Sequence, residues 1–306
     1  MKRRDFLVKG LGAGFAAGLL AKHTNVFSAG NLVDPSKKAL DLVAVMGGEP
    51  DVMFDRAIAS MGGIGKYVKK GMRVVVKPNI GWDKTPEYAA NTNPLLVKRI
   101  VEHCLQAGAK EVLVFDNTCD QWQRCYTNSG IEKAVKDAGG KMIPGNSERY
   151  YHSVNIPGGK RLKETKEHEA ILESDIFINV PVLKSHGGAT LTIAMKNLMG
   201  IIWDRGYWHR NDLHQCIADF ASYRKPTLNI IDAYRVMKQN GPKGVSLADV
   251  VTMKSLIISE DMVAADAAAA KLFGFNPSEV GYIQIAAQMG IGNMNLEKLN
   301  IERIKI

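Results

Sequence analysis

The sequence feature that most constrains the fold is an alternation of short apolar runs with longer helical stretches between residues 72 and 143. Residues 72–77 form a valine-rich run that stops at Pro78, which is typical of a buried strand. A helical stretch opens at Asn93-Pro94 and ends at Gly108. A strand at 111–115, a helix at about 130–138 and a strand near 141–143 follow. This order predicts a mostly parallel sheet flanked by helices.

The same kind of pattern continues through the rest of the chain. The polar segment 145–168 contains one predicted strand, at about 152–156. Further strands are predicted at 175–180, 228–231 and 255–259, and helices at 261–272 and about 277–288. No linker divides the sequence, so we expect one Rossmann-like α/β domain over residues 30–306, with its core at about 70–285.

Polar residues stand at the ends of four predicted strands. They are Lys77 and Asn79 around Pro78, Asp116 with Asn117, Lys184 and His186 just past Pro181, and Asp232. In open α/β sheets, ligands bind in the crevice beyond the carboxyl ends of the strands. The sequence therefore predicts a ligand cleft at this edge of the sheet.

The segment Pro181–Gly200 carries the densest chemistry. Its glycines allow a ligand to approach the backbone, whose amides are able to form an anion-binding nest. Lys184 and Lys196 are cationic donors, and His186 is a residue type that moves protons or binds metals. A helix over 190–200 would place Thr192 and Lys196 on one face. A glycine turn followed by a solvated amphipathic helix is the alternative interpretation.

This segment and several others resemble the DUF362 family. The shared motifs are Lys77-Pro-Asn79, Lys184-x-His186, Thr192-x-x-x-Lys196-Asn197-Leu-x-Gly200, Asp232, and Asp261-x-Val-Ala-x-Asp266 followed by Gly274. The resemblance runs from about residue 70 to 285. Members of this family are often joined to a ferredoxin-like module with two four-iron clusters. This chain lacks the cysteine spacing of such a module, so no iron–sulfur cluster is expected in it.

The resemblance and the residue types together predict a site for a small anionic substrate or a phosphorylated cofactor. The predicted binding residues are Lys77, Asn79, Lys184, Thr192, Lys196 and Asn197. We expect His186 to be the acid–base group, with Asp232 or Asp116 orienting it or a metal. Redox chemistry or isomerisation next to a carboxylate is the reaction class expected. The alternatives are a non-catalytic binder of anions or metals, and a redox or maturation partner of another exported protein.

A more distant resemblance is to the nickel-pincer lactate racemase family. That family has a histidine and a lysine ten residues apart, as His186 and Lys196 are here. There the lysine holds a pyridinium cofactor and a later histidine binds nickel, a part that His209 or His214 would take. Asn197-Leu198 departs from that family's pattern, so covalent attachment at Lys196 is not predicted. His186, His209 and His214 are therefore candidate metal ligands. The aromatic residues of segment 203–214, directly after the motif, make that segment a candidate lid that excludes water.

The first thirty residues have the layout of an export signal. A basic start with Arg3-Arg4 precedes an apolar run from Gly10 to Ala21, and cleavage is expected after Ser28 or Ala29. The arginine pair resembles a twin-arginine (Tat) signal. It predicts a periplasmic protein exported by the Tat machinery, or a membrane-tethered one if the signal stays uncleaved. A short amphipathic helix is the alternative.

The signal also accounts for much of the chain's positive charge. The whole chain carries a formal charge of +9. Residues 1–28 hold five basic side chains and one acidic one, a net of +4, which leaves +5 on the rest. No dense basic stripe with interleaved aromatics remains, so a nucleic-acid partner is not expected. Of the four cysteines, Cys119 and Cys125 are candidates for a disulfide, with free buried thiols as the alternative.

Overall fold

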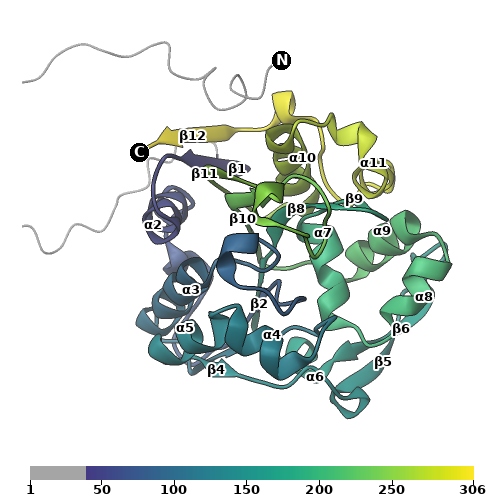
Figure 1. Cartoon of the computed structure of the whole chain (residues 1–306), viewed down its shortest axis with the longest axis horizontal. Coiled ribbons are helices and arrows are strands. Elements are labelled where there is room, and N and C mark those ends of the chain that lie inside the picture. Colours follow the sequence, from purple (N-terminus) through teal and green to yellow (C-terminus); the bar gives the residue numbers. More distant parts are fainter. Residues whose placement is uncertain (1–38) are drawn as a thin grey trace, which may run out of the picture.

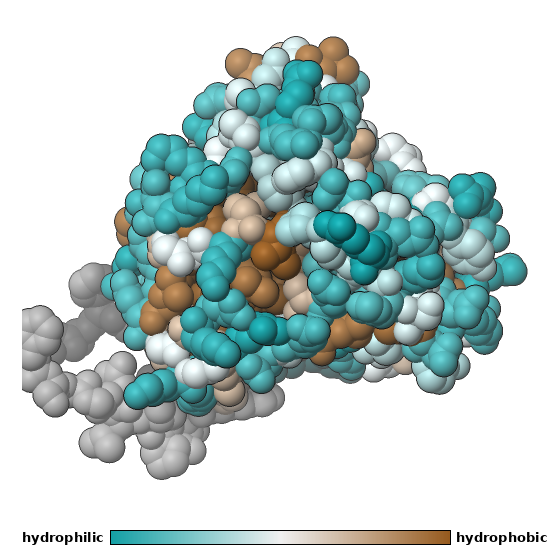
Figure 2. All heavy atoms as spheres, turned by 90° about the horizontal axis from the view of Figure 1, so that it is seen from below, coloured by the Kyte–Doolittle hydropathy of each residue, from teal (hydrophilic) through white to brown (hydrophobic). Residues whose placement is uncertain are grey.

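A computed structural model describes residues 39–306 (Figure 1). The predicted signal at residues 1–29 lies outside the described residues, and so does the beginning of the predicted domain at residue 30. Among the described residues, no helix is both long and apolar enough to span a membrane. The face shown in Figure 2 is mostly hydrophilic, with apolar atoms visible in a recess near its centre.

A single large sheet forms the middle of the domain and confirms the predicted α/β class. Its strands follow the order β12-β1-β11-β10-β7-β2-β3-β4. Their bounds are β1 Leu42–Met46, β2 Arg73–Pro78, β3 Glu111–Val114, β4 Lys141–Met142, β7 Ile176–Val180, β10 Leu228–Met237, β11 Val250–Ser259 and β12 Ile301–Lys305. Only β11 runs antiparallel to its neighbours on this path, β1 and β10. The sheet is therefore mostly parallel, as predicted.

Helices cover both faces of this sheet (Figure 1). One face packs against α2 (Pro50–Ser60), α3 (Pro94–Gln106), α4 (Trp122–Asn128) and α5 (Ile131–Asp137). The other packs against α6 (Glu169–Leu172), α7 (Ala194–Asn197), α8 (Arg205–Arg210), α9 (Leu213–Tyr223), α10 (Met262–Phe273) and α11 (Gly281–Gln288). A small antiparallel pair, β5 (Tyr151–Asn155) and β6 (Glu164–His168), lies outside the main sheet.

The strands are buried on both faces because their side chains alternate between two apolar cores. In β2, Val74 and Val76 belong to the core with α2 and α3, whereas Val75 belongs to the core with α9 and α10. Successive side chains of a strand point to opposite faces of the sheet. A continuous valine run therefore suits a central parallel strand that is covered on both sides.

Several details differ from the sequence-based expectation. The elements that were not predicted include strands β1, β6 and β12 and helices α2 and α4. The Pro181–Gly200 segment forms a hairpin of β8 (Val182–His186) and β9 (Thr190–Thr192) before α7 begins at Ala194. The expected helix over 190–200 is therefore wrong, and Thr192 is a strand residue. Strand β10 also continues past Asp232, through an irregularity between Ala233 and Arg235, to Met237.

A buried carboxylate holds the start of α7 in place. Asp266 of α10 accepts hydrogen bonds from the backbone amides of Ala194 (2.6 Å) and Met195 (3.0 Å). These amides begin the short helix and have no acceptor within it, so the carboxylate takes the part of an N-terminal cap. Asp261 caps α10 itself, through the amides of Val263 and Ala264, which confirms its predicted place at the helix start. The packing of α10 thus positions the helix that carries Lys196 and Asn197.

Candidate functional site

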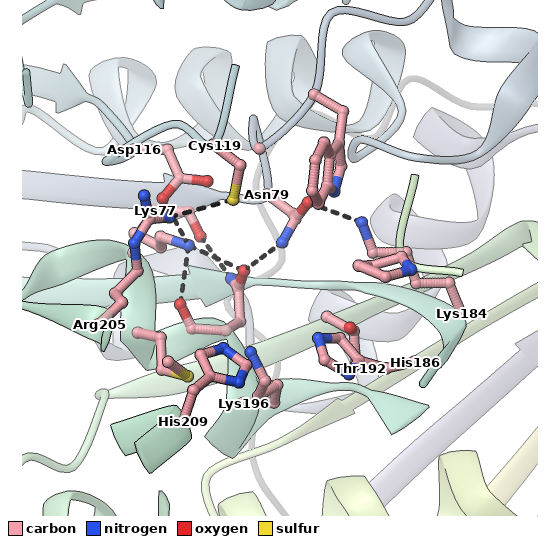
Figure 3. A pocket seen from close by; sticks show the side chains of 16 residues that line it. Lys77, Asn79, Asp116, Cys119, Lys184, His186, Thr192, Lys196, Arg205 and His209 are labelled. Carbon is pink, nitrogen blue, oxygen red and sulfur yellow. Dashed lines mark hydrogen bonds and ion pairs between the residues drawn. The ribbon is translucent and has the colours of Figure 1, made fainter. Parts of the chain in front are cut away.

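A cavity of about 420 Å³ opens where the parallel strands end (Figure 3). Its walls come from the carboxyl ends of β2 and β3, from the β8–β9 hairpin, and from α7 and α8. Among the described residues, its wall holds three lysines, one arginine, two histidines and a single carboxylate. They are Lys77, Lys184, Lys196, Arg205, His186, His209 and Asp116. Positive charge therefore outweighs negative charge in this cavity.

One of the lysines is neutralised inside the protein. Lys77 is buried, and its Nζ lies 3.0 Å from Asp116 Oδ1. It also donates to the backbone oxygen and to Oδ1 of Asn197, both at 2.8 Å. Burial lowers the pKa of Lys77, while the charge of Asp116 opposes that shift. Gly200 contacts this pair so closely that a Cβ there would collide with Asp116 Oδ1 and Lys77 Nζ.

A chain of asparagine side chains fixes the floor of the cavity. Asn197 Oδ1 accepts from Asn79 Nδ2 (3.0 Å), and Asn197 Nδ2 donates to Asn179 Oδ1 (2.9 Å). Asn179 Nδ2 in turn donates to Asn229 Oδ1 (3.0 Å). Buried polar groups need partners, and these amides satisfy one another across β2, β7, α7 and β10. The predicted residues Asn79 and Asn197 therefore lie together, held by a rigid network.

Lys184 has hydrogen-bond acceptors but no carboxylate partner. Its Nζ donates to Asn79 Oδ1 (3.1 Å) and to the backbone oxygen of Ala90. Burial, with the nearby charges of Lys196 and Lys77, lowers the pKa of Lys184 to about 7. Thr192, which pairs with Lys184 across the hairpin, lines the cavity too. Lys184 is therefore present as both ammonium and free amine near neutral pH.

Lys196 differs from the other two lysines because its charge has no partner. It is 9% exposed, and its Nζ makes no hydrogen bond or ion pair within the described part of the chain. Figure 3 shows its side chain between those of His209 and Thr192, in the wall of the cavity. Burial, together with the charges of Arg205 and Lys77, lowers the pKa of Lys196 to about 8. A buried cation that faces open space is costly unless a ligand compensates it.

Arg205 of α8 adds a fixed positive charge. Its guanidinium donates to the backbone oxygens of Asn117 (2.7 Å) and Thr118 (2.6 Å), just after β3. The same group donates to Cys119 Sγ at 3.3 Å. Carbonyl oxygens orient the guanidinium without cancelling its charge. Arg205 and Cys119 were not predicted as site residues, although Arg205 lies in the aromatic segment expected to be a lid.

His186 lines the cavity as a neutral ring with a defined tautomer. Its Nδ1 accepts hydrogen bonds from the backbone amides of Gly188 and Ala189, both at 3.0 Å. Because Nδ1 is an acceptor, the proton of the neutral ring is on Nε2. Burial and the charges of Lys196 and Lys184 lower the pKa of His186 to about 3.

This geometry corrects the predicted anion nest in the hairpin. Amides at Gly188 and Ala189 are committed to His186, so they do not form a free anion nest. His186 Nε2–H is a hydrogen-bond donor at neutral pH and has no free lone pair. The ring is therefore suited to donating a hydrogen bond to an oxygen of a ligand, and its acid–base role stays a prediction.

Comparison with known families bears out the resemblance in the sequence. The model of the domain of unknown function DUF362 matches residues 74–271, more than half of the chain. The chain belongs to the DUF362 family. The match lies within the stretch of about 70–285 on which the resemblance rested. The matched residues therefore include the whole wall of the cavity with its three lysines, whereas the sheet strands β1 and β12 lie outside the match.

Individual relatives are more distant. The "Thylakoid-associated protein sll1697" of Synechocystis sp. is 24% identical over 239 residues, which cover 76% of this chain and 72% of the relative. The lactate racemase apoprotein from Thermoanaerobacterium thermosaccharolyticum is 12% identical with a TM-score of 0.45, covering 71% of this chain and 54% of the racemase. A protein from Thermotoga maritima is 11% identical with a TM-score of 0.45, covering 79% and 60%. The chain thus spans less than two thirds of either solved structure.

Of the three predicted metal ligands of this DUF362 protein, His186 and His209 line the cavity, whereas His214 lies apart from them. The rings of His186 and His209 lie 6.2 Å apart, centroid to centroid. His214 begins α9, stacks on Tyr282, and accepts a hydrogen bond from the Tyr282 amide at Nδ1 (3.1 Å). Within residues 39–306, no group of three or more His, Cys, Asp or Glu side chains could hold a metal ion. The residues present therefore do not fit a nickel cofactor held by these histidines.

Asp232 and the cysteines also depart from their predictions. Asp232 is buried within β10, where its carboxylate accepts from the amides of Asn93 (2.7 Å) and Tyr234 (3.0 Å). It is absent from the cavity wall because the strand does not end at it. Cys119 is exposed and Cys125 is buried, and both are free thiols, so the predicted disulfide is wrong. Asp116 does reach the cavity, but its carboxylate is engaged by Lys77 and by the Ile80 amide.

The tautomer of His186 is directly measurable. We expect ¹⁵N NMR at pH 7 to show Nε2–H with an unprotonated Nδ1, and the ring to stay neutral until the pH falls towards its pKa of about 3. The physical reason is that protonated Nδ1 would face two N–H donors. The His186→Gln variant assigns the signal through its disappearance. Observation of an Nδ1–H tautomer, or of protonation near pH 6.5, would contradict this structure of the site.

Proposed function

We propose that this DUF362 protein binds a small carboxylate or phosphate compound in the cavity and catalyses its isomerisation. The observation that carries the proposal is the buried, unpartnered ammonium of Lys196. A cation in such a place destabilises the fold, because desolvation is not offset by any partner. An anionic ligand would provide that partner, and this is a common reason for such a residue to exist at a binding site.

The balance of charge around Lys196 supports the same proposal. The cavity wall holds four cations and one carboxylate, and that carboxylate is already engaged by Lys77. In the described part of the chain Lys184, Lys196 and Arg205 have no acidic partner within ion-pair distance. A ligand with one or two negative charges would offset the repulsion among them. His186 Nε2–H would add a directional donor to an oxygen of the ligand.

The proposed reaction uses Lys184 as the base, while the Lys196 ammonium pairs with the anionic group of the ligand. With a pKa of about 7, much of the Lys184 population is the free amine at neutral pH, which is able to take a proton from the carbon next to the carboxylate. The electron pair of the C–H bond then becomes the π bond of an enolate, and negative charge moves to oxygen. His186 Nε2–H and the other cations stabilise that charge. Return of the proton from the Lys184 ammonium to a different carbon or face gives the isomer.

Replacement of Lys196 provides the test of the binding site. We expect Lys196→Met to weaken the binding of sulfate by more than about tenfold, a loss of about 1.4 kcal/mol. Isothermal calorimetry measures the affinity. Lys133→Met is the matched control, because Lys133 is an exposed residue of α5 with an 80% exposed side chain. Equal sulfate affinity in the Lys196→Met protein and the wild type would contradict the proposal.

Two further measurements, one on the Lys196→Met protein and one on the wild type, strengthen this test. Lys196→Met should melt at or above the wild-type temperature, because it removes an uncompensated buried charge.

For the wild type, sulfate affinity should fall as the pH rises from 7 to 9, since Lys184 and Lys196 lose protons with pKa values of about 7 and 8. Sulfate itself does not titrate in this range. Tight anion binding without any turnover of 2-hydroxy or 2-keto acids would identify a binding protein instead of an isomerase.

We also propose that the protein leaves the cytoplasm by the Tat route. The basic start, the arginine pair Arg3-Arg4 and the apolar run behind it support this. Joint replacement of both arginines by lysine should retain the full-length precursor in the cytoplasm, as cell fractionation and immunoblotting would show. Lys9→Arg is the control, since it lies outside the pair. Equal export of the twin-lysine variant would overturn the proposed route.

A further inference from the structure

Cys119 differs from the other cysteines in its surroundings. Cys104, Cys125 and Cys216 are buried, and burial raises their thiol pKa values to about 12, 12 and 11. Cys119 is exposed and lines the cationic cavity. Only the thiolate form of a cysteine is a good nucleophile, and buried apolar surroundings suppress it. Cys119 is therefore the accessible thiol of the described chain.

Two neighbouring groups point from this thiol to an anionic ligand. Arg205 Nη1 donates to Cys119 Sγ at 3.3 Å, and the other acceptors of its guanidinium are backbone oxygens. Lys196, nine-tenths buried and without a partner, faces the same cavity. The backbone around the thiol is also fixed, because the Cys119 amide donates to the Gly81 oxygen (2.8 Å). Figure 3 shows Cys119 beside Asp116, on the same wall as Arg205.

We propose that Cys119 is a covalent modification site for small anionic electrophiles, which the cationic cavity attracts and orients. This inference rests on the proposed anion site, since the charges that would bind the substrate also bring the reagent to the sulfur. An adduct on Sγ that carries a carboxylate would place its negative charge among Lys196 and Arg205. Modification of Cys119 would therefore fill the cavity and block the binding of other anions.

Iodoacetate is the simplest probe of this chemistry. The Cys119 thiol gives its proton to solvent, and the sulfur then attacks the CH₂ carbon. A C–S bond forms as the C–I bond breaks, and iodide leaves. The product is a carboxymethyl thioether with one negative charge. Neutral iodoacetamide undergoes the same displacement without the charge, so comparison of the two reagents isolates the effect of the cavity.

The experiment compares the rates of both reagents at pH 7.5, followed by mass spectrometry with peptide mapping. We expect the ratio of iodoacetate to iodoacetamide rates to exceed that of N-acetylcysteinamide by at least about tenfold, because a cleft of one charge sign concentrates ions of the other. Sulfate should slow the reaction with iodoacetate. Lys196→Met should reduce the ratio, Lys133→Met should leave it unchanged, and Cys119→Ser should lose the fast reaction.

The adduct itself gives a second readout. Treatment with iodoacetate should abolish sulfate binding in the wild type, whereas treated and untreated Cys119→Ser protein should bind sulfate alike. A rate ratio equal to that of N-acetylcysteinamide, or fast labelling of another cysteine, would overturn the inference. If sulfate binds with normal affinity in that case, the proposed anion site still holds. If sulfate does not bind but Cys119 still favours iodoacetate, the proposed function fails and the reactive thiol remains.

Discussion

An excess of positive charge in one cavity is the constraint on which the rest of this structure depends. Four cationic side chains meet a single carboxylate there, and that carboxylate is engaged by Lys77. Burial and, after it, repulsion from the neighbouring cations lower the pKa values of Lys184 and Lys196 to about 7 and 8. The positive charge of the cavity is therefore reduced either when its lysines lose protons or when an anion binds.

The surrounding fold maintains this unfavourable arrangement through neutral hydrogen bonds. Asn197 joins Lys77 to the asparagine network under the cavity, and Asp266 holds the first turn of the helix that bears Lys196. Gly200 leaves the space that the Lys77–Asp116 pair occupies. Backbone oxygens orient Arg205 without neutralising it. Each of these contacts fixes a position while leaving the positive charge of the cavity available to a ligand.

Sequence patterns predicted the frame of the site because parallel strands impose a simple geometry. Residues that follow β2, β3 and β7 must meet at one edge of the sheet, so Lys77, Asp116 and Lys184 could be placed together in advance. The motifs shared with the DUF362 family added Lys196 and Asn197 to the predicted site. The alternation of apolar runs likewise predicted the parallel core and the helices on both of its faces.

Other features depend on contacts that no local pattern encodes. Asp232 looked like a strand end, but an irregularity in β10 lets the strand continue beyond it. Histidine is a common metal ligand, yet the ring of His214 accepts a hydrogen bond from the backbone amide of Tyr282, which is distant in sequence. The tautomer of His186 follows from two amides in a tight turn, and the place of Arg205 follows from the packing of α8. These features depend on tertiary contacts, so they could not be predicted from the residue type and its local sequence alone.

The central claim is that an anion belongs beside Lys196, and a crystal structure grown with selenate tests it most directly. The anomalous scattering of selenium identifies the ion independently of any water in the cavity. This account predicts selenate within hydrogen-bond distance of Lys196 Nζ and His186 Nε2, with no rearrangement of the Lys77–Asp116 pair. A cavity without an anomalous peak, in a crystal whose other surfaces bind selenate, would contradict it.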